Sequence, residues 1–189
     1  PTGFLALAKP LIASGMLPAD SRLSVPAVSG YSGGGKSMIG AHDSGELASQ
    51  FSYGTSLSHK HLAEMTHYAG LTTPPIFMPS VGDFYAGMLV HLPLHADQFA
   101  GAVEANQLYQ LYADWYAAAP LVRMGAARAN DENTPKMLAA DALADTDSME
   151  IFVFSDVKSQ QFWLVARLDN LGKGASGAAV QNMNIALGI

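Results

Sequence analysis

A chain of 189 residues is long enough for one domain with a buried hydrophobic core. The formal net charge is −6 and the ten lysines and arginines are spread singly, so neither nucleic acid nor an anionic membrane surface is an expected partner. No apolar stretch reaches the ~18 residues that cross a bilayer. The lack of cysteine excludes disulfides, zinc–thiolate sites and thiol catalysis by these residues.

The first expected elements are a helix, a strand and a glycine-rich loop. Apolar residues recur at helical spacing from Phe4 to Ile12. Pro10 lies inside this pattern and has no N–H, so we expect it to kink or shorten the helix. Residues 22–29 then have the pattern of a short strand, which leads into the glycine-rich residues 30–35.

The middle of the chain is predicted to contain short elements and one longer helix. Residues 40–54 are expected to be mostly loop. A short helix is expected at 62–68, and strands at 76–78 and 85–94. Asp97 is a plausible helix N-cap. Between Leu108 and Trp115, apolar residues follow at i, i+3, i+4 and i+7, which indicates one buried helical face that ends before Pro120.

The second half is predicted to be rich in strands. The strand candidates are residues 121–124, 136–143, 149–154 and 161–168. Short loops between them favour antiparallel pairing. A last helix is expected at 174–187. The predicted fold class is therefore α+β, one domain with a mostly antiparallel sheet flanked by helices.

Residues 30–37, Gly-Tyr-Ser-Gly-Gly-Gly-Lys-Ser, match the pattern of a nucleotide-binding P-loop. In a P-loop, backbone N–H groups bind phosphates and a helix follows directly. Gly40 and Gly45 weaken the helical pattern here, and the predicted antiparallel strands do not fit the parallel sheet of that fold. A P-loop nucleotide phosphotransferase is thus a minor alternative. There are two other interpretations. The segment is a plain turn, or it is a loop whose backbone N–H donors face an anionic substrate.

His59, His61, Glu64 and His67 form the densest cluster of ionisable residues. The spacing i, i+3, i+6 from His61 spreads the side chains over too wide an arc to converge on a metal ion, so we predict no metal site. A single catalytic histidine is a better hypothesis, because a pKa near 6.5 suits proton transfer. A surface or packing role is the interpretation that the residues alone favour, since most histidines have one.

Residues 169–179, Asp-Asn-Leu-Gly-Lys-Gly-Ala-Ser-Gly-Ala-Ala, join the last predicted strand to the last predicted helix. Small residues at such a junction let a ligand approach the helix N-terminus closely. Tight packing of the helix on the sheet, without a ligand, explains the same residues equally well.

Taken in order, these motifs resemble those of N-acetyl-γ-glutamyl-phosphate reductases, in particular the shorter, type 2 branch. Residues 1–3 are similar to the segment after that family's active-site cysteine, and residues 29–35 resemble its Ser-Gly-x-Ser-Gly-x-Gly segment. Residues 60–64 resemble Arg-His-x-Pro-Glu, with Ala63 in place of the proline. Residues 169–184 resemble Asp-Asn-Leu-x-Lys-Gly-Ala-x-Gly-x-Ala-Val-Gln-Asn-x-Asn.

The resemblance implies part of an NADP-dependent reductase of arginine biosynthesis, located in the cytoplasm. The reaction converts N-acetyl-glutamyl 5-phosphate to N-acetyl-glutamate 5-semialdehyde and phosphate through a cysteine thioester. Residues 1–189 are then the catalytic and dimerisation domain, with a fold like the C-terminal domain of glyceraldehyde-3-phosphate dehydrogenase. The Rossmann domain that binds NADP and the nucleophilic cysteine are expected before Pro1, so the chain alone is expected to be inactive. A homo-oligomer, dimer or tetramer, is also implied.

The resemblance assigns roles to nine residues of this chain. His61 is the acid–base residue, and the nucleophilic cysteine is expected two positions before Pro1. The substrate-binding residues are Ser29, Gly30, Ser32 and Gly33. The cofactor-binding residues are Asn170, Gly172, Lys173 and Gly174. Two further alternatives remain: a domain of aspartate-semialdehyde dehydrogenase type, and a non-catalytic dimerisation module, which the charged fraction of only 14% and the missing thiol suggest.

Overall fold

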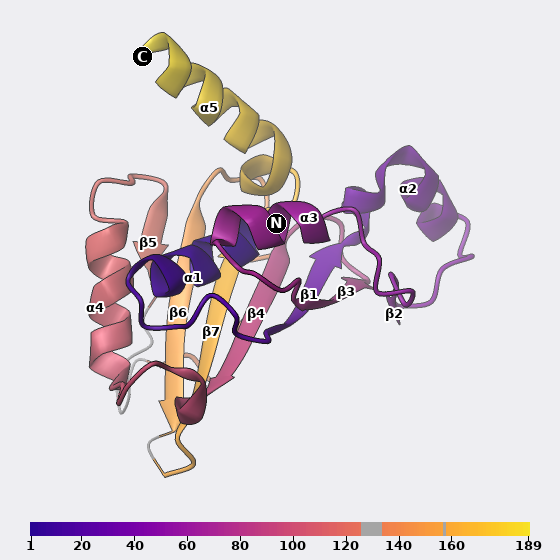
Figure 1. The fold of residues 1–189 in the computed structure, drawn as a ribbon. Helices are drawn as coiled ribbons and strands as arrows, with labels where there is room; N and C mark the ends of the chain where they lie inside the picture. The colour runs from indigo at the N-terminus through magenta and orange to yellow at the C-terminus, as the bar shows by residue number, and fades with distance from the viewer. Residues whose placement is uncertain (126–133, 157) are drawn as a thin grey trace.

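The computed structural model describes residues 1–125, 134–156 and 158–189, and these form one seven-stranded sheet with helices (Figure 1). The strand order is β2-β3-β1-β4-β7-β6-β5. The strands are β1 (Ser24–Gly30), β2 (Gln50–Ser52), β3 (Ile76–Gly82), β4 (Met88–His95), β5 (Val122–Met124), β6 (Met149–Asp156) and β7 (Gln161–Leu168). The α-helices are α1 (Thr2–Ala13), α2 (Gly35–Asp43), α3 (Leu62–Ala69), α4 (Ala105–Trp115) and α5 (Gly177–Leu187).

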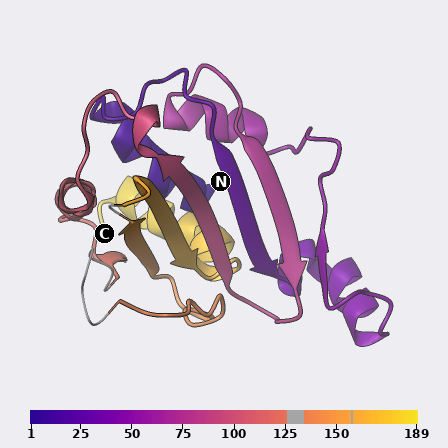
Figure 2. The same cartoon turned by 90° about the horizontal axis from the view of Figure 1, so that it is seen from below.

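Three helices cover one face of the sheet. Figures 1 and 2 show α1, α3 and α4 on this face, whereas α2 lies beyond the β2 edge and α5 projects away from the sheet. The main core fills the space between the three helices and the sheet, with Leu7, Met65, Leu108 and Leu164 fully buried. Burial of each such side chain contributes about 1.5–3 kcal/mol, so this layer holds α1 and α3 in place.

Helix α1 runs unbroken from Thr2 to Ala13, so the expectation that Pro10 shortens it is wrong. Pro10 has no N–H to donate to the carbonyl of Ala6, four residues earlier. The hydroxyl of Tyr116 in the segment after α4 donates to that oxygen instead, at 2.9 Å. A long-range hydrogen bond thus replaces the missing helical one, which local periodicity does not reveal.

The sheet is mixed rather than mostly antiparallel, which corrects the predicted fold class within α+β. β1 pairs in parallel with β3, and β5 pairs in parallel with β6. The remaining pairs are antiparallel. Parallel neighbours need a long crossover connection. Residues 31–75 supply one between β1 and β3. β5 and β6 are likewise well separated in the sequence, since β5 ends at Met124 and β6 begins at Met149.

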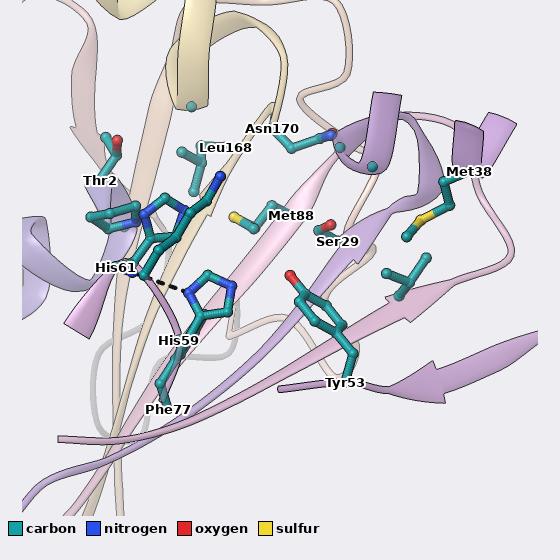
Figure 3. Close-up of a pocket in the computed structure, with 17 residues that line it drawn as sticks. Thr2, Ser29, Met38, Tyr53, His59, His61, Phe77, Met88, Leu168 and Asn170 are labelled. Atoms are coloured by element: carbon teal, nitrogen blue, oxygen red, sulfur yellow. Dashed lines mark hydrogen bonds between the residues drawn. The ribbon is translucent and has the colours of Figure 1, made fainter. Parts of the chain in front are cut away.

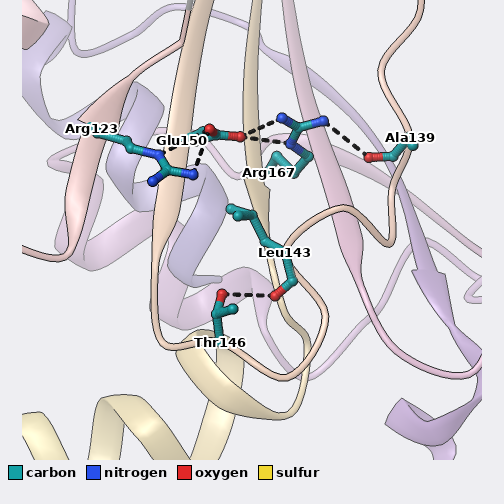
Figure 4. A network of polar contacts seen from close by, with 6 residues as sticks. All are labelled: Arg123, Ala139, Leu143, Thr146, Glu150 and Arg167. Atoms are coloured by element: carbon teal, nitrogen blue, oxygen red, sulfur yellow. Dashed lines mark hydrogen bonds and ion pairs between the residues drawn. The ribbon is translucent and has the colours of Figure 1, made fainter.

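The strand predicted at 136–143 does not form. In its place an irregular segment lies against the second face of the sheet, where Leu138 and Ala140 pack on the small cluster of Leu89, Phe152 and Val165. Figure 4 shows how Glu150 on β6 pairs with Arg123 on β5 and with Arg167 on β7, while Arg167 also donates to the carbonyl of Ala139 at 3.4 Å. Side-chain contacts, not a strand ladder, therefore hold this segment.

Three further expectations need correction. The loop predicted at 40–54 contains the end of α2 and the strand β2. Asp97 lies in a short 3-10 turn, η2 (Ala96–Gln98), and α4 is capped by Glu104. The last helix begins with a π-helical turn, η3 (Gly172–Ser176), before α5. Among the described residues no helix has the length and apolar character needed to span a membrane.

Candidate active site

A cavity of about 320 Å³ opens where the start of α1, the end of β1 and the segment before α3 meet (Figure 3). Of the predicted site residues, those that line it are Ser29, Gly33, His61, Asn170 and Gly174. These residues are distant in the sequence, and the sheet brings them together because β1, β4 and β7 are neighbours. The lining also includes Thr2 and Gly3 at the start of α1.

The N-terminus of α1 gives one end of the cavity an anion-binding character. The first helical hydrogen bond runs from the N–H of Leu5 to the carbonyl of Pro1, so the N–H groups of Thr2, Gly3 and Phe4 have no partner within the helix. Together with the helix dipole, such free N–H groups favour a negative charge nearby. Gly3 lets the start of α1 pack closely on the sheet, because a Cβ there would lie 2.8 Å from the side chain of Val90 on β4.

His61 lies beside the start of α1 and immediately before α3. Burial, followed by the positive charges of the Pro1 amino group, His59 and Lys60, lowers the pKa of His61 to about 4. Its Nδ1 is 3.8 Å from the carboxylate of Glu64, which is about half exposed and does not offset these effects. An amide bond at Pro1 would remove one of the three charges. The imidazole is therefore neutral at neutral pH and able to accept a proton.

The cavity also contains two residues to which the sequence analysis gave no role of their own, His59 and Tyr53. The Nδ1 of His59 accepts the backbone N–H of His61 at 3.2 Å, so the proton of the neutral ring is assigned to Nε2. His59 stacks edge-on against Phe77 at 5.1 Å, and burial lowers its pKa. Its proximity to His61 in the sequence was a usable signal. For Tyr53 there was none.

Asn170 ties three segments together around the cavity. Its Oδ1 accepts the N–H of Gly87 at 2.8 Å, and its Nδ2 donates to the hydroxyl of Ser32 at 3.0 Å. A Cβ on Gly33 would lie 3.2 Å from the same Nδ2, so glycine leaves room for the amide. Both ends of the Asn170 amide are thus used inside the protein. A cofactor contact through this side chain would compete with these bonds.

The remaining predicted residues lie outside the cavity lining. Gly30 packs against the carbonyl of Tyr85, and Ser32 is buried below the loop. Gly172 faces the carbonyl of Thr146, where a Cβ would come within 2.4 Å. Lys173 is only 6% exposed, and its ammonium donates to Gln181 within the same helical segment. The geometry therefore does not bring Lys173 to the cavity.

The P-loop alternative does not fit the structure. A helix does follow the glycines, since α2 begins at Gly35, but Lys36 and Ser37 are exposed and do not line the cavity. β1 also has an antiparallel neighbour, β4, unlike the parallel sheet of P-loop proteins. Within the described ranges, no group of three or more His, Asp or Glu could hold a metal ion.

The mixed sheet, the helices on one face and the histidine-lined cavity define a domain of the semialdehyde dehydrogenase class. The chain matches the family model described as "Semialdehyde dehydrogenase, dimerisation domain" over residues 1–170, and it belongs to that family. Two solved structures share the fold. Aspartate semialdehyde dehydrogenase II from Vibrio cholerae has a TM-score of 0.65 and 15% identity, and the match covers 98% of this chain and 59% of that one. Aspartate semialdehyde dehydrogenase from Francisella tularensis has a TM-score of 0.68 and 13% identity, and the match covers 98% of this chain and 62% of that one.

Closer relatives in sequence are reductases. The chain is 42% identical over 200 residues to N-acetyl-gamma-glutamyl-phosphate reductase of Trichormus variabilis, with 100% of the chain and 62% of that protein covered. It is 45% identical over 195 residues to the reductase of the same name from Brucella anthropi, with 100% and 61% covered. The resemblance predicted from the motifs is confirmed. The chain spans somewhat less than two thirds of the length of these relatives.

Proposed function

We propose that residues 1–189 are the catalytic and dimerisation domain of an NADP-dependent N-acetyl-γ-glutamyl-phosphate reductase of arginine biosynthesis. The observation that carries the proposal is the cavity in which the start of α1, His61 and the glycine-rich loop meet. The identity of 42–45% to reductases, against 13–15% to the aspartate semialdehyde dehydrogenases, favours this substrate over aspartyl phosphate. The place of such a biosynthetic enzyme is the cytoplasm.

A Rossmann domain with the nucleophilic cysteine precedes Pro1 in this proposal, because the relatives are longer than the chain. NADP binds mainly to that domain and reaches the cavity near Gly174. Gly174 adds no side chain to this wall, whereas Leu168 and Asn170 do, so the room for a flat ring is at Gly174. When bound, NADPH supplies the hydride that reduces the acyl group. Lys173, buried and bonded to Gln181, takes no part in this contact.

The residues of this chain bind the substrate and move a proton. A thiolate ahead of α1 forms a C–S bond with the acyl carbon while the C–O bond to phosphate breaks. The free N–H groups at the start of α1 stabilise the thiolate. After the resulting thioester has been reduced, the C–S bond breaks and the aldehyde forms. Neutral His61 accepts the hydroxyl proton of the reduced intermediate as the C–S bond breaks. In the reverse direction it gives that proton back to the aldehyde oxygen as the thiolate adds to the carbonyl carbon.

The test is phosphate-dependent oxidation of N-acetyl-glutamate 5-semialdehyde by the full-length protein. His61→Ala should lower kcat by roughly 10²- to 10⁴-fold, the usual loss for a general acid–base residue. Aspartate semialdehyde, assayed side by side, should be a poor substrate. Turnover close to wild type in the His61 variant would remove this residue from its role, and preference for aspartate semialdehyde would refute the substrate assignment.

We also infer that the domain forms a homo-oligomer through the open face of the sheet, with a second copy as the partner. The segment with Leu138 and Ala140 covers part of this face, which lies opposite to α1, α3 and α4. The uncovered part exposes 52% of Ile76, 43% of Met78 and 44% of Trp163. Trp163 stacks on His91 and donates its indole N–H to the Nδ1 atom of His91 at 3.1 Å, so the two rings hold each other in place. The description of the family as a dimerisation domain supports a second copy as the occupant.

A further inference from the structure

Met38 is the side chain through which helix α2 reaches the candidate active site. No residue of α2 is buried, and α2 lies beyond the edge of the sheet. Met38 nevertheless lines the cavity, and Figure 3 shows it on the side opposite to Thr2 and His61, with Ser29 and Met88 between them. The reacting end of the cavity and the Met38 end are thus separate.

The position of Met38 depends on a glycine. An added Cβ on Gly34 would lie within 2.5–2.6 Å of the Cβ, Cε and Sδ atoms of Met38. The thioether therefore occupies the space that a side chain at position 34 would take. At the other end of α2, His42 contacts the carboxylate of Asp83 at 2.7 Å and stacks on Tyr31 at 3.7 Å. Both ends of the helix are anchored, so Met38 has a defined place over the cavity.

The wall near Met38 suits an apolar, uncharged group of a ligand. Phe77, Val81 and Met88 line the cavity as well, and none of its described lining residues is Asp or Glu. A free α-ammonium group would find no carboxylate counter-ion among these lining residues, so its burial would be unfavourable. An acylated nitrogen carries no charge and has a small apolar end that can pack against a thioether.

We infer that Met38 forms the end of the subsite for the N-acyl group and limits the length of the acyl chain. This inference rests on the proposed function. With the acyl carbon of the substrate beside the start of α1, the methyl of the N-acetyl group lies six bonds away, roughly 7 Å when extended. That places the methyl group toward the Met38 end, and the size of residue 38 then decides which acyl groups fit.

The experiment uses the full-length reductase and four substrates, the N-formyl, N-acetyl, N-propionyl and N-butyryl derivatives of glutamate 5-semialdehyde, with phosphate and NADP. Met38→Ala should raise kcat/KM for N-propionyl relative to N-acetyl by about tenfold or more, since one methylene in an apolar pocket changes selectivity by roughly 10- to 200-fold. Met38→Phe should shift the preference toward N-formyl. Met38→Leu, which conserves volume, should keep the wild-type order.

Two glycine variants separate this role from a general effect on the helix. Gly34→Ala should alter the same acyl preference although Met38 is unchanged, because it displaces the thioether. Gly40→Ala in the same helix should not, since a Cβ there meets no atom within 4 Å. If the ratio of kcat/KM for N-propionyl to that for N-acetyl in Met38→Ala stays within about twofold of wild type, the inference about Met38 is refuted and the proposed function is not. A wild-type protein that oxidises none of the four substrates refutes the proposed function, and the inference with it.

Discussion

The hydrogen bond from Tyr116 to α1 compensates for Pro10, and this can be tested by a double-mutant cycle. The carbonyl of Ala6 has no helical donor, and Ala6 is 9% exposed. Tyr116→Phe leaves this buried acceptor without a partner, which costs about 1–3 kcal/mol. In a domain of this size, that lowers Tm by roughly 2–10 °C. Urea unfolding of the chain, followed by circular dichroism, measures the change in the free energy of unfolding.

The second arm of the cycle restores the missing helical donor. In a Pro10→Ala background the N–H of residue 10 can reach the carbonyl of Ala6, so Tyr116→Phe should cost less than about 1 kcal/mol there. Tyr68→Phe is the control, since its side chain is 59% exposed and its loss should change stability by under about 0.5 kcal/mol. Equal costs of Tyr116→Phe in both backgrounds would refute the reasoning.

Two further predictions concern the site and the open face. His61 should titrate near pH 4 in an NMR experiment on this chain. Its pKa in the folded state lies below the unfolded value of 6.5, so the unfolded state binds more protons between these two pH values. Stability should therefore fall as the pH drops from about 6.5 toward 4. His61→Gln should flatten this slope, and an unchanged slope would contradict the lowered pKa. In sedimentation experiments, Trp163→Lys should shift the protein toward the monomer. The control is Trp115→Lys, which should not, because Trp115 is equally exposed at 44% but lies on α4. If both variants associate like the wild type, the interface lies elsewhere.

Local patterns predicted most of the elements that position the site. The strand predicted at 161–168 matches β7 at both ends, and the segments at 62–68 and 149–154 correspond to α3 and β6. Such patterns work because the period of a helix or strand depends on neighbours within about four residues. The prediction at 136–143 failed because that segment is held by the side chain of Arg167 and by packing of Leu138, which are contacts from other strands.

The sequence by itself determined the family, the α+β class and the histidine segment, because ordered motifs and short-range periodicity carry that information. Only the tertiary structure decided which strands pair in parallel and which motif residues share a cavity. It turned Lys173 inward, committed the amide of Asn170 to Gly87 and Ser32, and brought Met38 and Tyr53 to the site. The physical reason is that packing between segments far apart in the chain determines the cavity walls and the strand partners. A local sequence pattern does not show which distant segments come into contact.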